Sequence, residues 1–238
     1  MRGFCPVCNH YSLFLLTDKI EMMRNDGLCI WCSSVSRNRH VAKCILEEFK
    51  NKNIKSLSDF RERDDISVYN TSSQGPIARI MGISKNIITS EFIDDCPLGS
   101  VSDGVLCQNL ENLTFPDERF DLIISQDVFE HVKDYRRGFS EVYRVLKKNG
   151  LHIFSIPFYF DKKTEELFSL NHGKYELREP IEYHGDPIRG KIPAYTHFGY
   201  DLFDFLQGIG FNARISISQY ADEKKYATFN SYTFITRK

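Results

Sequence analysis

Two short cysteine pairs constrain the N-terminal part of this chain more than any other feature of the sequence. Cys5 and Cys8 enclose Pro-Val, Cys29 and Cys32 enclose Ile-Trp, and twenty residues separate the two pairs. This spacing lets two turns bring four thiolates around one tetrahedral zinc ion. Because four sulfur ligands leave no place for water, the metal is expected to be structural. We predict a zinc-binding module over residues 1–40.

Alternative roles for the cysteines fit the pattern less well. Four unrelated buried thiols would rarely fall into two CxxC pairs. A redox pair normally opens a helix in a βαβ unit, whereas turn-like residues flank both pairs here. His10 is another candidate ligand, although four cysteines already complete the shell. The remaining three cysteines are expected to be single buried thiols: Cys44, Cys96 and Cys107.

A helix is expected directly after the cysteine pairs. In SVSRNRHVAKCILEEF, apolar residues from Val41 to Phe49 recur at helical spacing, and Ser36 is a suitable N-cap. Three basic side chains at its entrance either pack on the zinc module, face a substrate anion or are solvated: Arg37, Arg39 and His40.

Composition and charge indicate the class of protein. The chain has 238 residues, of which 42% are hydrophobic, enough for a sizeable core. No apolar run reaches the roughly 18 residues of a membrane span, and the first residues lack the apolar core of a signal peptide. We therefore expect a cytoplasmic protein. The net charge of −1 gives no general attraction for nucleic acid, although residues 1–61 carry ten Lys/Arg against six Asp/Glu.

The chain after Asp64 alternates short β-branched segments with helical ones, which is typical of βαβ units and a mostly parallel sheet. The last two expected strands follow each other without room for a helix, so we expect them to form an antiparallel hairpin. The expected strands are 66–70, 87–91, 104–108, 120–125, 151–157, 211–219 and 227–236.

Two segments between these strands stand out. In KDYRRGFSEVYRVLKKNG an apolar face predicts an amphipathic helix, with Asp134 as N-cap and Asn149-Gly150 at its end. Residues 158–199 are rich in turn residues, His and Tyr and have little periodicity. A long irregular stretch of this kind in a compact domain is usually a lid or a binding insertion.

The segment from Asn109 to Pro157, NLENLTFPDERFDLIISQDVFEHVKDYRRGFSEVYRVLKKNGLHIFSIP, carries a family resemblance. It resembles the central half of class I S-adenosylmethionine-dependent methyltransferases of the type 11-like group, whose pattern reads LPFPDxSFDLVxxxxVLEHVxDxxxxLxExxRVLKPGGxLxxxxP. The turn at Gly210-Phe211 fits as well. The resemblance implies a Rossmann-like, mostly parallel sheet of seven strands with a C-terminal antiparallel hairpin. The methyltransferase domain would then span residues 41–238, with the lid or acceptor-binding insertion at 158–199.

The resemblance also implies where S-adenosylmethionine binds. A glycine-rich loop after the first strand wraps the methionine part of the cofactor in this family, and Asn70 to Gly75 occupies that position with a single glycine. The small Ser and Thr residues there still offer amides and hydroxyls. Glu91 matches the carboxylate that takes both ribose hydroxyls, and Asn109 matches the adenine contact. The expected cofactor-binding residues are Asn70, Thr71, Ser72, Gly75, Glu91, Phe92, Asn109, Leu110, Gln126 and Asp127.

The resemblance reaches the cysteine module more loosely. A group of bacterial methyltransferase-like proteins carries CPxC pairs followed by a basic helix entry, and this chain has Ile30 where that group has proline. These proteins often share a downstream YHGxP and FG pattern, which matches Tyr183 to Pro187 and Phe198-Gly199 here.

The resemblance implies in-line methyl transfer to a small polar acceptor, and family association alone favours an oxygen of a sugar, sugar nucleotide, surface-glycan or natural-product intermediate. A histidine is the natural base for a hydroxyl acceptor. His184 is the first candidate, with Asp186 as its orienting partner; His172 and His197 are alternatives. Glu130 and His131 are expected to support the loop.

Two other functions compete with this prediction. An RNA methyltransferase would use the zinc module with Arg37 and Arg39 as its grip, but the near-neutral charge and the lack of an (N/D)PPY motif count against base N-methylation. A non-catalytic methyltransferase-fold protein would have lost the cofactor with the glycines of its loop. No membrane partner is expected.

Overall fold

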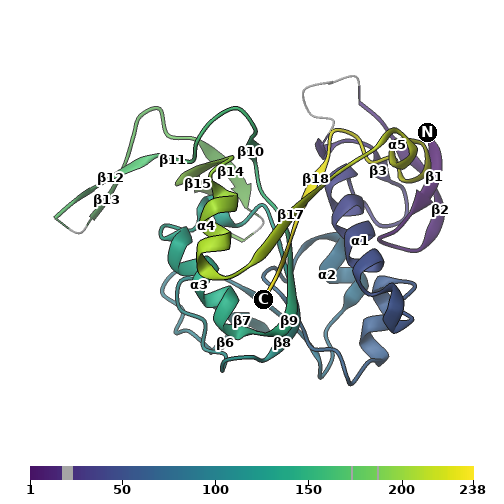
Figure 1. Cartoon of the computed structure of the whole chain (residues 1–238), viewed down its shortest axis with the longest axis horizontal. Coiled ribbons are helices and arrows are strands. Elements are labelled where there is room, and N and C mark those ends of the chain that lie inside the picture. The colour runs from purple at the N-terminus through teal and green to yellow at the C-terminus, as the bar shows by residue number, and fades with distance from the viewer. Residues whose placement is uncertain (18–23, 173, 187) are drawn as a thin grey trace.

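The computed structural model describes residues 1–17, 24–172, 174–186 and 188–238. Part of the spacer between the cysteine pairs and Pro187 of the YHGxP pattern therefore lie outside the described residues. The centre of the molecule is an eight-stranded sheet with the order β17-β18-β9-β8-β4-β5-β7-β6, with helices on both faces (Figure 1). This order and the mostly parallel pairing confirm the expected Rossmann-like methyltransferase fold.

The strands of the central sheet differ in length: β9 has ten residues and β8 seven, whereas β4 beside β8 has three. Strands β4, β5, β7, β8 and β9 run parallel, and β8 is largely buried because both of its faces are covered. Seven strands match expected segments; β6 is additional. The bounds are β4 Val68–Asn70, β5 Ile87–Glu91, β6 Val101–Ser102, β7 Val105–Cys107, β8 Phe120–Gln126, β9 Leu146–Ser155, β17 Asn212–Ile217 and β18 Tyr232–Arg237.

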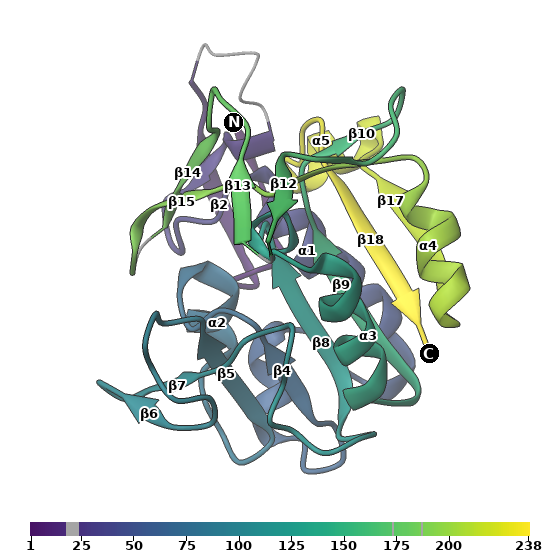
Figure 2. The same ribbon diagram turned by 90° about the vertical axis from the view of Figure 1, so that its left-hand side faces the viewer.

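Alternating side chains of β8 build the two halves of the core. Leu122 and Ile124 pack with α1 (Ser36–Glu48) and α2 (Gly75–Met81) on one face. Ile123 packs on the other face with α3 (Tyr135–Val145) and α4 (Leu202–Ile209). The result is a three-layer αβα arrangement, visible from the side in Figure 2.

The C-terminal hairpin forms as expected, but its connection does not. Strand β18 lies between β17 and β9 and is antiparallel to both. The connection holds a seven-residue helix, α5 Tyr220–Tyr226, so the expectation of no room for a helix was wrong. Residues 227–231, which the β-branched and aromatic composition placed in a strand, instead form the turn that follows α5.

Helix α3 begins as the sequence indicates and ends earlier. The Asp134 side chain accepts a hydrogen bond from the backbone N of Arg137 at 3.0 Å, which confirms the N-cap. The helix stops at Val145 rather than at Asn149-Gly150, because the chain already pairs with β8 from Leu146 onward.

The N-terminal segment forms a small antiparallel sheet that leads into α1. Its strands are β1 Arg2–Cys5, β2 His10–Leu15 and β3 Leu28–Cys29. Val35, not Ser36, is the N-cap of α1; the Ser36 hydroxyl instead bonds the backbone of Phe229, near the C-terminal hairpin. Since α1 runs across the expected domain boundary at residues 40 and 41 and packs on β18 and β9, it belongs to both parts of the fold.

The segment 158–199 contains short strands in place of an irregular lid. Three of them form one small sheet, β10-β16-β11, and the others form two hairpins. Figure 1 shows this insertion and the N-terminal module at the same end of the central sheet. The bounds are β10 Phe158–Tyr159, β11 Glu165–Glu166, β12 Phe168–Asn171, β13 Lys174–Leu177, β14 Tyr183–Asp186, β15 Gly190–Pro193 and β16 Thr196–Gly199. Within the described ranges, no helix is long and apolar enough to span a membrane.

Candidate functional site

The carboxyl ends of the parallel strands bring the expected cofactor residues to one edge of the sheet. Strand β4 ends at Asn70, β5 at Glu91 and β8 at Gln126. Parallel register places Asn70 opposite Thr89 and Ile124. Ligands of open α/β sheets bind at this edge.

The loop after β4 is held by Glu91. One carboxylate oxygen, Oε1, accepts from Ser72 Oγ at 2.9 Å and from the backbone N and the Oγ of Ser73 at 2.7 and 2.9 Å. In this structure the carboxylate that is expected to bind the ribose is thus bonded to two serines of the loop. Glu91 and the loop thus lie together, as the sequence indicated, and Ser73 is a contact that the sequence did not single out.

Buried polar atoms in this loop fit a bound cofactor. Asn70 and Thr71 are almost fully buried, and among the described residues Asn70 Nδ2 and Thr71 Oγ1 have no hydrogen-bond partner. Unpaired buried donors are costly, so these atoms are well placed to bond a ligand. Gly75 begins α2 at φ +85°, a conformation that only glycine adopts without strain. The single glycine of the loop is therefore explained by backbone geometry.

The expected adenine side is formed by Phe92, Asn109 and Leu110. Leu110 is buried, Asn109 Oδ1 accepts from the backbone N of Glu111, and Phe92 is 40% exposed. The guanidinium of Arg189, from the insertion, lies 5.2 Å from the Phe92 ring centre. The insertion therefore reaches the cofactor side of the sheet.

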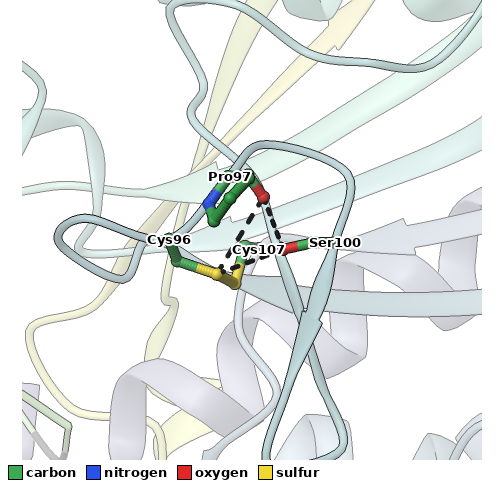
Figure 3. The surroundings of a disulfide bond; sticks show 4 residues. All are labelled: Cys96, Pro97, Ser100 and Cys107. Carbon is green, nitrogen blue, oxygen red and sulfur yellow. Dashed lines mark hydrogen bonds between the residues drawn. A yellow bond between two sulfur atoms is a disulfide. The ribbon is translucent and has the colours of Figure 1, made fainter.

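A disulfide lies beside these residues. Cys96 and Cys107 are bonded, and Ser100 Oγ lies 3.4 Å from Cys96 Sγ while donating to the Pro97 carbonyl (Figure 3). The expectation of single buried thiols was therefore wrong for these two cysteines and holds for Cys44. No sequence pattern indicates this pairing, because the two residues meet only when the loop after β5 folds back onto β7.

The end of β8 is contacted by the N-terminal module. Asp127 forms ion pairs with Arg24 and Arg37, at 2.8 Å from Arg37 Nε, and Gln126 accepts from Asn38 at 2.9 Å. Burial alone would raise the pKa of Asp127, but the two arginines outweigh it and hold the pKa below its usual value. Gln126 and Asp127, which are both expected at the cofactor, thus contact the first turn of α1, and Asp127 also contacts Arg24 before it.

Arg39 lies entirely inside the protein. It donates to the carbonyls of Gly27, Ser34, Tyr226 and Ala227, and its guanidinium lies 4.4 Å from the Phe14 ring centre. It therefore packs on the module. Its expected role as an RNA contact is wrong, because no part of the side chain reaches solvent.

Four histidine and glutamate side chains meet where the insertion covers the chain after β8. Glu182 accepts from His184 Nε2 at 2.8 Å and from His197 Nε2 at 2.7 Å. His184 Nδ1 lies 3.1 Å from His131 Nε2. Burial tends to raise the pKa of Glu182, but its two histidine partners outweigh this and lower it.

The other residues that the sequence placed in this region lie differently. Asp186 accepts from the backbone N atoms of Ile188 and Arg189, so Glu182 and not Asp186 is the carboxylate that contacts His184. Glu182 stands two positions before His184 in EYHGD, and in a β-strand this i, i+2 spacing puts both side chains on one face. That spacing is the signal that could have identified it. His172 is exposed on a turn.

The four cysteines of the module converge. Their sulfur atoms all lie within 4.8 Å of one another, with 3.7 Å between Cys5 and Cys32 and 3.9 Å between Cys8 and Cys29. Sulfurs at about 2.3 Å from a tetrahedral zinc ion would lie about 3.8 Å apart. The residues present therefore fit such an ion.

A family comparison agrees with the fold. Residues 85–154 match the family described as "Methyltransferase domain". A search of curated proteins gives no match.

Similar solved structures are distant in sequence. A methyltransferase from Mesorhizobium loti is 13% identical over 73% of this chain and 91% of its own, with a TM-score of 0.44. One from Clostridium acetobutylicum is 15% identical over 82% and 96%, with a TM-score of 0.45. One from Methanosarcina mazei is 18% identical over 78% and 98%, with a TM-score of 0.41.

The strand order and the antiparallel hairpin are those of the class I S-adenosylmethionine-dependent methyltransferase fold, and residues 85–154 match the methyltransferase domain family within it. This chain carries that domain, with an added cysteine cluster at its N-terminal end and an insertion over the carboxyl edge of its sheet.

Proposed function

We propose that the protein transfers a methyl group from S-adenosylmethionine to an oxygen of a small polar acceptor, of the sugar, sugar-nucleotide or natural-product type. The observation that carries the proposal is the carboxylate Glu182 with His184 and His197 in the insertion, at the edge of the sheet where the cofactor residues end. The cofactor supplies an electrophilic methyl group when bound. What the chain supplies is a place for the acceptor and a base for its proton.

The insertion offers a cavity for a small acceptor. A pocket of about 240 Å³ is lined by Glu182, Ala194 and His197 together with the segment 177–181. This volume is below the roughly 300–1,000 Å³ of sites for drug-sized ligands, which supports an acceptor of modest size. The charged side chains Glu165, Arg178 and Glu182 in its lining can bond hydroxyl groups, while Leu167, Leu177 and Ile181 give it an apolar wall.

His197 fits the role of base better than His184. Because His197 Nε2 donates to Glu182, its Nδ1 carries the lone pair and can accept the acceptor's hydroxyl proton. Both ring nitrogens of His184 are already engaged, by Glu182 and His131. The Glu182 carboxylate would stabilise the imidazolium that forms at His197.

The cofactor would be held by the loop Asn70–Gly75 and by Glu91, which exchanges its bonds to Ser72 and Ser73 for those to the ribose. A carboxylate with two acceptor oxygens suits a vicinal diol. We also propose that Cys5, Cys8, Cys29 and Cys32 hold one structural zinc ion. Arg39 is buried and Arg37 is paired with Asp127, so neither of the two arginines expected to contact RNA is free to bind a phosphate.

Calorimetric titration with S-adenosylmethionine and S-adenosylhomocysteine tests the cofactor site. We expect micromolar binding that Glu91→Ala weakens by about tenfold or more, since one lost charge-assisted interaction is worth about 1.5–3 kcal/mol. Glu62→Ala, which removes an exposed acid outside the site, is the matched control. Absence of binding in the unmodified protein would instead support the non-catalytic alternative.

An acceptor screen follows with radiolabelled cofactor and hydroxyl-bearing sugars, sugar nucleotides and RNA. The proposal is supported if a small acceptor becomes labelled by the unmodified protein, and if neither His197→Ala nor His197→Gln labels it. Label on RNA alone would refute it.

A further inference from the structure

Three side chains converge at a buried point that methyl transfer to an acceptor does not require. Glu130 Oε1 lies 3.8 Å from His131 Nε2 and 3.9 Å from His184 Nδ1, and these two nitrogens are 3.1 Å apart. Glu130 and His131 follow β8, whereas His184 comes from β14 of the insertion. The cluster therefore forms only when the insertion folds onto the sheet edge.

His131 and His184 each make a hydrogen bond with the ring nitrogen that faces away from the cluster, and this bond fixes the tautomer. His131 Nδ1 lies 2.8 Å from the Pro193 carbonyl, which only accepts, so Nδ1 carries the proton and Nε2 the lone pair. His184 Nε2 faces the Glu182 carboxylate at 2.8 Å, so its proton is there and Nδ1 carries the lone pair. Two lone pairs thus point at each other across 3.1 Å.

Glu130 adds a third electron-rich group. Its side chain is 2% exposed, and among the described residues neither carboxylate oxygen has a hydrogen-bond partner. Buried carboxylates are ordinarily paired, because leaving them without a partner is very costly. Three acceptors that face one point without a donor between them call for either a proton or a metal cation there, and the geometry decides between the two.

We propose that Glu130, His131 and His184 bind one divalent transition-metal cation, separate from the cysteine cluster. Ligand atoms at about 2.0–2.1 Å from a tetrahedral ion lie about 3.3 Å apart, and the three observed separations of 3.1 to 3.9 Å are close to this value. Two imidazoles with one carboxylate suit zinc, iron, cobalt or nickel, whereas magnesium and calcium prefer oxygen ligands.

The surroundings have the form that metal-ligating histidines usually show. Such a histidine donates its other ring N–H to a carbonyl or a carboxylate, which orients the ring and raises its basicity. The Pro193 carbonyl accepts from His131 in this way, and the Glu182 carboxylate accepts from His184. The carboxylate of Glu182 adds a second negative charge beside the site, while the nearby Arg24 and Arg37 are paired with Asp127.

A cation at this place would act on the acceptor, and this part of the inference rests on the proposed function. A hydroxyl bound to a divalent metal loses its proton more readily. His197, which shares Glu182 with the metal ligand His184, would accept that proton. His184 would then be a ligand and not the base.

Cobalt titration of the full chain tests the site. The protein is first dialysed against a chelator and its zinc content measured, so that any metal retained by the cysteine cluster is counted. Co²⁺ is then added and followed by calorimetry and by visible absorption. We expect one further site per chain with the absorption of nitrogen and oxygen ligands, and an affinity that His184→Ala and Glu130→Gln each weaken by about 100-fold or more.

Two controls make the result specific. His172→Ala removes an exposed histidine of the same insertion and should bind Co²⁺ like the unmodified protein. His184→Gln keeps a polar side chain in case alanine disturbs the insertion, and circular dichroism checks that each variant is folded.

The outcomes separate the metal site from the proposed function. Glu91→Ala should weaken cofactor binding and keep Co²⁺ affinity unchanged, so a failure to bind S-adenosylmethionine leaves the metal result interpretable. No further Co²⁺ site in the unmodified protein, or an affinity unchanged in folded His184→Ala and His184→Gln, would overturn the proposal. A proton shared by His131 and His184 would then be the positive group of the cluster.

Discussion

Arg37 Nε in the first turn of α1 lies 2.8 Å from Asp127 Oδ2 at the end of β8. The pair joins the N-terminal module to the sheet edge that carries the cofactor residues. Arg24 completes the contact from the other side of the carboxylate. The module therefore stabilises the position of a strand end in the site.

The strength of this connection can be measured by a double-mutant cycle. Arg37→Ala and Asp127→Ala, singly and together, should show a coupling of about 1 kcal/mol or more in the free energy of unfolding, because both side chains are largely buried. Urea denaturation of the four proteins gives the value. The exposed pair Arg178 and Glu165 is the control and should couple by less than about 0.5 kcal/mol. Additive effects at Arg37 and Asp127 would contradict the prediction.

Replacing Arg39 by lysine should strongly destabilise the protein. A lysine ammonium has three donors and no planar fork, so it cannot serve carbonyls on several sides of the buried guanidinium. We expect a loss of about 3 kcal/mol or more in unfolding free energy, measured by urea denaturation. Arg2→Lys, at an exposed arginine of the same module, should change it by less than about 0.5 kcal/mol. Equal effects at the two positions would show that the buried contacts contribute little.

The cysteine cluster predicts tightly held zinc. Metal analysis after dialysis against a chelator should find about one zinc ion per chain in the unmodified protein and in Cys44→Ala, which removes a thiol outside the cluster. Cys29→Ser should lose this zinc and melt at a lower temperature, because binding free energy of a structural metal is also folding free energy. Zinc retained by Cys29→Ser would exclude the four-sulfur site.

Stability should fall in mild acid because of His152 in the middle of β9. Burial lowers the pKa of His152 to about 3, below that of an unfolded chain near 6.5. The unfolded state then binds the extra proton, so stability is lost as the pH falls below about 6.5 and continues to be lost down to about 3. Because unfolding then takes up about one proton at His152, the free energy of unfolding changes with pH by a slope that approaches about 1.4 kcal/mol per pH unit.

Urea denaturation at pH 7 and pH 5 measures this slope. In His152→Gln, which keeps an amide near Ser125 Oγ, the pH dependence should be shallower by the contribution of this one group. His172→Gln, at an exposed histidine, should leave it unchanged. An unchanged slope in His152→Gln would refute the assignment.

The sheet was predictable because its strands are short apolar runs separated by helical periodicity, and because the segment Asn109–Pro157 carries a family pattern. The periodicity of residues 220–226 is too short to separate a helix from a strand end, so α5 was missed. The insertion was predicted only as irregular, since its strands pair within small hairpins and have no alternating buried face.

The positions of Asn70 and Glu91 in the fold were predictable, because each residue stands at the end of one expected strand. The contacts of Arg24 with Asp127 and of His131 with His184 join residues 103 and 53 positions apart, and only the folded chain brings them together. A single sequence carries no information on such pairs. Glu130 shows this most clearly: the pattern EH suggested a supporting role, and only its burial without partners indicates a ligand.

The contacts of Arg39 also bear on how the protein is made. Three of its five carbonyl acceptors belong to Asp26, Gly27 and Ser34, but the other two belong to Tyr226 and Ala227. During synthesis on the ribosome, the guanidinium therefore lacks two of its five acceptors until residues 226 and 227 have emerged. The first helix can form early, but its final docking waits for residues 226 and 227, and a nascent chain stalled before them would leave that arginine without these two acceptors.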